Sequence, residues 1–301
     1  MEATLAGPVV RVLTAAYLIS MMLSMGLDLG GGPRLERAEK RRERRLLVRA
    51  LALDLVVLPL LAYSLTRLFR AGGDLSIAFL LLAACPGGRF APQLARIARA
   101  DLALAVEVTL FVAKSVSLTA PLTLRWMLHT RRIEIDELRF IAQLALLQLA
   151  PYLLGKALRK RRPGWAERLA LPARVASTIA VFLLLFVVLL RGLLPALWRL
   201  GDRGWLAVIG FAALSLALGW LVGGPQRRTR ATFAIGANAR DLALALMIAN
   251  LAFPGSDSIQ PLAVAIWVVL FAFNYGFASF LGHRSPRPLL LVPMRPTRAP
   301  Q

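Results

Sequence analysis

Cysteine and histidine are almost absent from this chain. Its 301 residues include one cysteine, Cys85, and two histidines, His129 and His283. One cysteine cannot form an intramolecular disulfide or a cysteine-rich metal site. Two histidines that are remote from each other and lack a nearby acidic cluster make a poor metal site. We therefore expect no metal centre and no cofactor.

Acidic residues are scarce as well, with 16 aspartates and glutamates against 37 lysines and arginines. Most of the carboxylates lie between the apolar segments of the chain. The sequence contains no serine–histidine–aspartate set, no phosphate-binding glycine loop and no HExxH motif. We therefore expect no catalytic residues and no enzymatic activity, including that of an intramembrane enzyme.

What the chain has in excess is apolar sequence. Hydrophobic residues make up 58% of it and the mean hydropathy is +0.64, whereas soluble domains are roughly 45–50% apolar. A helix needs about 20 mostly apolar residues to cross a membrane. Nine segments meet this need: 3–29, 46–69, 76–100, 102–128, 138–158, 170–194, 205–222, 231–253 and 259–281. The sequence thus predicts an all-α, multi-pass membrane protein with nine transmembrane helices.

The beginning of the chain does not resemble a cleaved signal. The opening residues MEATLAGPVV lack a basic region and a small-residue cleavage site. We therefore expect the first apolar segment to be a retained helix.

The net charge of +21 has two possible explanations. A soluble protein with such a charge would be a candidate for nucleic-acid binding. Here the basic residues lie in short stretches between apolar segments, which indicates membrane orientation instead. With the N-terminus outside, 23 lysines and arginines fall on the inner side and eight on the outer side. We expect the N-terminus outside, the C-terminus inside, and the basic stretch 34–49 as a cytoplasmic loop.

Two of the nine segments contain helix-breaking residues. The third carries Pro86, Gly87, Gly88 and Pro92, and the eighth carries the polar stretch 236–241. Non-helical backbone at membrane depth persists only where protein buries it or water reaches it. The two broken segments are five apart, an odd number, so they run in opposite directions. This arrangement is typical of a transporter built from an inverted repeat with a discontinuous helix in each half.

The repeat predicts how the single transporter domain, residues 1–301, is organised. Residues 138–281 form a full repeat of five helices. Residues 3–128 form a repeat of four that lacks its first helix, and 282–301 form a cytoplasmic tail. We expect the chain to break near residues 87–90 and 236–238, and the two breaks to cross near the middle of the membrane.

Several stretches resemble the bile acid:sodium symporter family across nearly the whole chain. They are MMLSMGLDL at 21–29, CPGG at 85–88, ARADLALAVEVTL at 98–110 and RTRATFAIGANARDLALAL at 228–246. The resemblance implies crossing broken helices and a core domain that moves against a panel domain. It also implies a cell (inner) membrane transporter that carries small organic anions, usually together with sodium.

The sodium ligands of that family are mostly missing after the CPGG motif. The family typically continues with Thr-Ala-Ser-Asn, whereas this chain has Arg89 first and Ala91 and Pro92 in place of the serine and asparagine. In the next helix a serine ligand of the family corresponds to Ala105. Only Thr109 keeps its hydroxyl.

The second break also lacks sodium ligands of the family. The family sequence Glu-Val-Gly-Met-Gln-Asn corresponds here to Gly-Ala-Asn-Ala-Arg-Asp at 236–241. The glutamate that serves both sodium sites is thus Gly236, and the glutamine is Arg240. A hard cation requires several oxygen ligands, preferably including a carboxylate. We therefore expect no sodium coupling, and we expect the positive head of Arg240 to fill the space of the ion.

The two breaks and their alignment with the family pattern define the expected site. The candidate substrate- or ion-binding residues are Arg240, Arg89, Gly236, Asn238, Thr109 and Asp241, and the crossover residues are Pro86, Gly87, Gly88 and Pro92. Structural roles remain open for several of them. Asp241 is most simply a helix N-cap, Arg89 could extend its head to water, and Thr109 could bond its own helix.

Ionisable residues inside the spans leave further structural alternatives. Asp54, Glu107 and Lys114 are functional suspects because charges are costly there. Glu107 and Lys114 share a helix face and could satisfy each other. Arg240 could likewise be a structural residue that pairs with Asp241 or Glu107.

Three functions remain open from the sequence. The first is organic-anion transport without sodium, in a chain whose partners are the small anion and the lipid bilayer, with no nucleic acid. The second is sodium-coupled transport through backbone carbonyls and Thr109. The third is a membrane binding or sensor protein that has kept the fold and no longer transports.

Overall fold

The computed structural model describes residues 3–28, 37–88, 90–128, 137–190, 193–253, 256 and 258–284. Within these ranges every regular element is a helix. This agrees with the all-α prediction.

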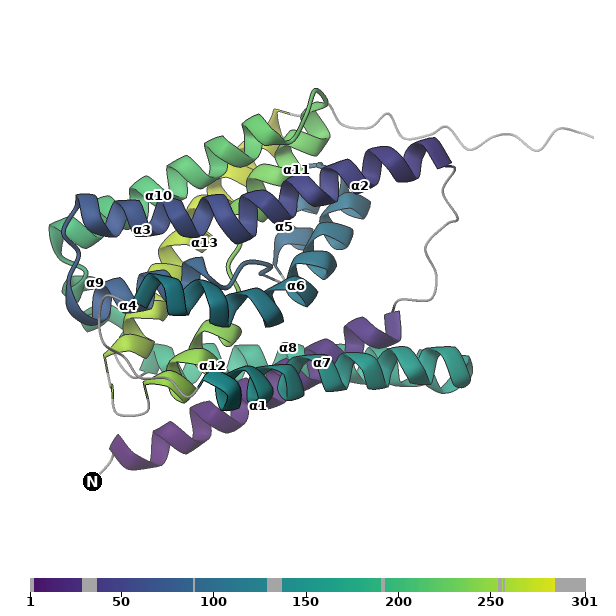
Figure 1. The fold of residues 1–301 in the computed structure, drawn as a ribbon, viewed down its shortest axis with the longest axis horizontal. Coiled ribbons are helices and arrows are strands. Elements are labelled where there is room, and N and C mark those ends of the chain that lie inside the picture. The colour runs from purple at the N-terminus through teal and green to yellow at the C-terminus, as the bar shows by residue number, and fades with distance from the viewer. Residues whose placement is uncertain are drawn as a thin grey trace, which may run out of the picture.

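Three long helices form one layer of the molecule (Figure 1). They are α1 (Ala3–Asp28), α7 (Glu137–Arg161) and α8 (Pro163–Leu190). Two glycines let α1 and α7 approach closely. A Cβ atom on Gly26 would lie 2.3 Å from the Tyr152 carbonyl oxygen, and one on Gly155 would lie 2.6 Å from the Leu23 carbonyl oxygen. Small residues at such contacts are typical of helix packing in membranes.

The remaining helices form a second group, which contains most of the buried apolar core. They are α2 (Arg37–Ala52), η1 (Leu53–Val57), α3 (Leu58–Leu68), α4 (Gly73–Ala83), α5 (Ala91–Ile97), α6 (Leu102–Leu128), α9 (Leu193–Arg199), α10 (Gly201–Val222), α11 (Arg227–Asn238), α12 (Leu242–Ala252) and α13 (Ile259–His283). Helix α13 runs through this group and packs against α4, α5 and α9 to α12. Phe79 of α4 and Phe211 of α10 meet edge to face within the core.

Three helices of the described chain are long and apolar enough to cross a membrane, judged by length and composition: Arg44–Leu68, Gly201–Val222 and Ile259–His283. Shorter apolar helices cover Val12–Leu27, Gly73–Ala83, Leu102–Ala113 and Leu242–Ala252. Each of the nine predicted segments contains helix. The number of nine transmembrane helices stays a prediction.

The prediction of a loop over the basic stretch 34–49 was wrong for most of its length. Helix α2 begins at Arg37 and continues through the π-helix η1 into α3, as one rod (Figure 1). Arginine, glutamate, alanine and leucine are good helix formers, so the basic end simply prolongs the apolar helix. Of the predicted tail, residues 282 and 283 end α13, and 285–301 lie outside the described residues.

The second helix break lies further along the chain than predicted. Helix α11 continues to Asn238, so Gly236 is helical, and the extended residues are Ala239 and Asp241. An isolated glycine is tolerated within a helix at a cost of about 1 kcal/mol. The break is therefore not at the glycine but next to Asp241, whose side chain starts the following helix. The first break lies between the end of α4 at Ala83 and the start of α5 at Ala91, as expected.

Candidate functional site

The two helix breaks meet each other. Pro86 and Arg240 form an isolated antiparallel bridge. The Asp241 backbone N–H donates to the Cys85 carbonyl oxygen at 2.8 Å. Helix ends leave backbone groups without intrahelical partners. Here the two non-helical segments that cross supply hydrogen-bond partners to each other.

Glycines at the first break make this close approach possible. A Cβ atom on Gly88 would lie 2.7 Å from the Arg240 carbonyl oxygen, closer than real Cβ atoms come. Gly87 has a φ of +94°, a conformation that glycine adopts at no steric cost. Pro92 is near the start of α5, where its missing N–H is not needed. The CPGG motif thus allows the two broken segments of the chain to cross in close contact.

The guanidinium of Arg240 lies between the ends of the two broken helices. Its Nη1 donates to the Ala83 carbonyl oxygen at 3.2 Å, and its Nη2 donates to the Ala237 carbonyl oxygen. Nη2 also lies 3.6 Å from Oδ1 of Asp54. The Phe211 ring closes one side, with its centroid 5.5 Å from Cζ. The side chain is fully enclosed, since Arg240 is 2% exposed.

Electrostatics explain why a cation is stable there. Ala83 is the last residue of α4, and Ala237 is in the last turn of α11. Carboxyl ends of helices carry partial negative charge, and the Asp54 carboxylate adds a full one. A guanidinium keeps its charge and offers several donors in a fixed plane. The arrangement therefore holds one cation among two carbonyl oxygens and one carboxylate.

Asp54 completes this site from an unexpected element. It is buried in the five-residue π-helix η1, and single π-helical turns are frequently found at functional sites. Among the described residues, Oδ1 of Asp54 and Nε of Arg240 have no hydrogen-bond partner. The contact between the Asp54 carboxylate and Nη2 of Arg240 is thus an ion pair at 3.6 Å and not a hydrogen bond.

The sequence prediction named other partners for Arg240. Asp241 and Glu107 were the alternatives, whereas the ion pair observed in the structure is with Asp54. The sequence did mark Asp54 as a charged residue inside a span, and this was its only indication that Asp54 belongs to the site. Pairing it with Arg240 required knowing which helix lies beside the crossover.

Asp241 acts as the N-cap of α12. Its Oδ1 accepts a hydrogen bond from the Leu244 backbone N–H at 3.1 Å, three residues along. This geometry is typical of an aspartate cap and confirms the predicted cap. The backbone N–H of the same residue donates to the Cys85 carbonyl oxygen, so Asp241 also takes part in the crossover.

Asn238 ties α11 to its neighbours. Its Oδ1 accepts from the Ser215 hydroxyl at 3.0 Å, and its Nδ2 donates to the Leu270 carbonyl oxygen at 2.9 Å. It also lines a small pocket together with Gly88, Phe90, Arg240, Trp267 and Asn274. The Trp267 ring N–H donates to the Arg240 carbonyl oxygen at 3.0 Å, so the pocket lies directly against the crossover.

The remaining predicted residues are more dispersed. Gly236 is partly exposed, and a Cβ atom there would meet nothing within 4 Å. Thr109 is buried on α6. Ala91 and Ala105, which replace ligands in the resemblance, are buried too. Arg89 lies outside the described residues.

Comparison with known proteins identifies a family. None of the curated proteins compared with this chain matches it significantly. The Sodium Bile acid symporter family matches residues 15–194, well over half of the chain. Proteins of this family are multi-pass membrane transporters and not enzymes, in agreement with the predicted class. The chain belongs to the sodium bile acid symporter family.

Proposed function

We propose that this protein is a secondary-active transporter of small organic anions that works without the sodium sites usual in its family. The family supports the general class, a transporter of bile acids or other organic anions. One observation carries the more specific proposal. The guanidinium of Arg240 lies between the crossing helix ends and donates to a carbonyl oxygen of each, and we propose that it takes the place of the family's coupling cation there.

The residues at the crossover do not fit a sodium ion. The position of the family's carboxylate is Gly236, which offers no side-chain oxygen, and the position of its glutamine is Arg240. The Ala237 carbonyl oxygen, a natural oxygen ligand, already accepts a hydrogen bond from Arg240. A second cation beside the guanidinium would be repelled. Sodium is therefore neither cofactor nor coupled ion in this proposal.

The arrangement of helices supports transport by alternating access. The crossing breaks come from segments of opposite direction, which favours an inverted repeat of residues 3–128 and 138–281. Helices α1, α7 and α8 form a layer of their own, which meets the helices that carry the crossover where α1 packs against α12 (Figure 1). Movement of that layer against the rest would expose the site to each side of the membrane in turn.

The substrate region is proposed around the crossover. It comprises Arg240, Asn238, Gly236, Asp241, Thr109 and Arg89, with Pro86, Gly87, Gly88 and Pro92 forming the crossover itself. Arg240 supplies the charge that attracts an anion, balanced at rest by Asp54. The proposed orientation has the N-terminus outside and the C-terminus in the cytoplasm, in the cell (inner) membrane, on the basis of the 23 to eight distribution of basic residues.

Transport by purified protein in liposomes tests this proposal. A panel of radiolabelled organic anions is offered to liposomes that contain the full chain, with liposomes lacking protein as the control. Uptake of at least one anion above the control supports the proposal. Binding of an anion without any uptake would contradict it and would favour the sensor function, while uptake that requires sodium would favour the symporter.

A further inference from the structure

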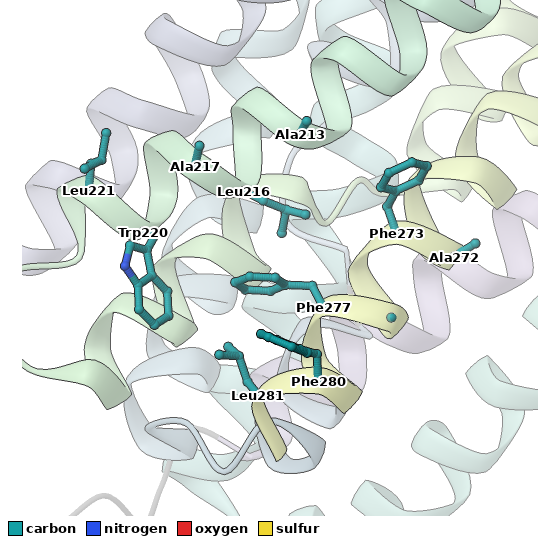
Figure 2. A pocket seen from close by; sticks show the side chains of 11 residues that line it. Ala213, Leu216, Ala217, Trp220, Leu221, Ala272, Phe273, Phe277, Phe280 and Leu281 are labelled. Atoms are coloured by element: carbon teal, nitrogen blue, oxygen red, sulfur yellow. The ribbon is translucent and has the colours of Figure 1, made fainter. Parts of the chain in front are cut away.

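A wide apolar groove lies between α10 and α13, and none of its lining residues belongs to the crossover. Its volume is about 1000 Å³. Leu216, Ala217 and Trp220 line it from α10, and Phe273, Gly276 and Phe277 line it from α13 (Figure 2). The rings of Trp220 and Phe277 meet edge to face across it. Every lining side chain is apolar except for the indole nitrogen of Trp220.

The groove is nearly as long as one leaflet of a bilayer is thick. On α10 its lining extends from Ala213 to Leu221. Eight residues of α-helix correspond to about 12 Å, and one leaflet contributes about 15 Å of the roughly 30 Å hydrocarbon core. Gly276 keeps the groove open in the middle, since a Cβ atom there would meet nothing within 4 Å.

One end of the groove is basic. Leu221 and Leu281 lie at that end, and Arg227 donates from its Nη2 to the Leu281 carbonyl oxygen at 3.3 Å. The Arg284 guanidinium lies 4.3 Å from the centroid of the Phe280 ring, which also lines the groove. Arg227 and Arg284 are both exposed. Two guanidinium groups thus border the apolar surface where the headgroups of that leaflet would be.

No acidic residue offsets this charge in the sequence around the groove. There is no aspartate or glutamate from residue 213 to 240 or from 272 to 301. Trp220 lies near the same end (Figure 2), and tryptophan is enriched at the level of the headgroups. Basic pockets beside transmembrane helices bind anionic headgroups.

We propose that this groove binds one anionic phospholipid, with its acyl chains between α10 and α13 and its phosphate beside Arg227 and Arg284. The proposal rests on membrane insertion alone and is independent of the substrate and of sodium coupling. The lipid would fill the groove and stabilise the packing of α10 on α13.

Native mass spectrometry and thermal unfolding of the purified full chain test the proposal. Phosphatidylglycerol and phosphatidylcholine with identical acyl chains are the probes. We expect phosphatidylglycerol to bind in a 1:1 complex and to raise the unfolding temperature more than phosphatidylcholine does. The variant Arg227→Gln/Arg284→Gln should weaken phosphatidylglycerol binding by about 30-fold, because each arginine contributes roughly a factor of five. Gly276→Trp should abolish binding of both lipids.

Two matched variants serve as controls. Arg161→Gln/Arg162→Gln removes two exposed arginines at the end of α7, and Gly164→Trp adds the same ring where a Cβ atom also meets nothing. Neither should change lipid binding. Equal stabilisation by both lipids, equal loss in the control variants, or a second copy of the chain in place of lipid would overturn the proposal.

Discussion

At the scale of single residues, the main departure from the family pattern is Arg240, which stands at the position of a glutamine and pairs with Asp54. Both side chains are buried, and taking two charges out of water costs several kcal/mol per ion unless they are well paired. The two charges therefore depend on each other. A change to one of them is expected to act through the other.

A double-mutant cycle measures this dependence. Arg240→Ala should lower the free energy of unfolding by about 3–5 kcal/mol, because it leaves the Asp54 carboxylate buried and unpaired. Asp54→Asn should be destabilising for the converse reason. Asp54→Asn/Arg240→Gln should be more stable than the sum of the two single changes predicts. Additive effects in denaturant unfolding would contradict the ion pair.

The same variants separate a role in binding from a role in folding. Asp54→Asn should strengthen the binding of an anion, since Arg240 then lacks its internal counter-ion. Arg240→Lys keeps the charge but loses the planar fork, so it should weaken anion binding. Anion affinity that is unchanged in a stably folded Asp54→Asn/Arg240→Gln variant would remove Arg240 from the site.

Gly88 is the second residue whose substitution should clearly lower the stability of the protein. A Cβ atom there would collide with the Arg240 carbonyl, and backbone cannot move aside as a flexible side chain can. Gly88→Ala should therefore cost about 1–3 kcal/mol or more and separate the two breaks. Gly72→Ala is the matched control, since a Cβ atom on Gly72 meets nothing within 4 Å. Equal thermal stability of both variants would show that the crossing is looser than described.

At the scale of elements, the N-terminus of α12 is fixed by one side chain. Asp241→Ala should lower stability by about 0.5–2 kcal/mol, because the Leu244 N–H loses its acceptor. Asp241→Asn keeps a capping oxygen and should cost much less. Thermal unfolding of the two variants side by side checks the prediction. Equal losses would indicate that the charge of Asp241 matters more than its cap.

The sequence predicted the elements well where apolar runs were long and uninterrupted. The segment 102–128 corresponds to α6 without error, and the predicted end of 205–222 is the end of α10. The second break was displaced because glycine only permits a break, whereas a cap and extended backbone make one. The basic stretch 34–49 was mistaken for a loop because charge was taken as a sign of irregular structure.

The site was less accessible to sequence reasoning than the elements were. The crossing of the breaks followed from their odd spacing, and the N-cap role of Asp241 followed from its place before an apolar run. The partner of Arg240 could not be predicted, since Asp54 is 186 positions away in the chain. Contacts of this kind depend on which helices pack together, and local patterns do not specify that.

At the scale of the whole molecule, the distribution of basic residues makes a prediction about topology. A cysteine introduced as Arg42→Cys should resist an impermeant reagent added outside intact cells, because α2 is expected to begin in the cytoplasm. Gly72→Cys, beyond the other end of the same rod, should react. The native Cys85 is buried and should add little background. Strong labelling at position 42 would reverse the orientation.

The central claim is that Arg240 takes the place of a sodium ion, and the dependence of anion binding on sodium tests it most directly. The affinity of the purified protein for a transported anion is measured in sodium and in potassium. The Gly236→Glu/Arg240→Gln variant, which restores two family ligands in a position with open space, is measured beside it. The account predicts equal affinity in both salts for the natural chain and a preference for sodium in the variant. A steep rise of affinity with sodium in the natural chain, absent with potassium, would contradict it.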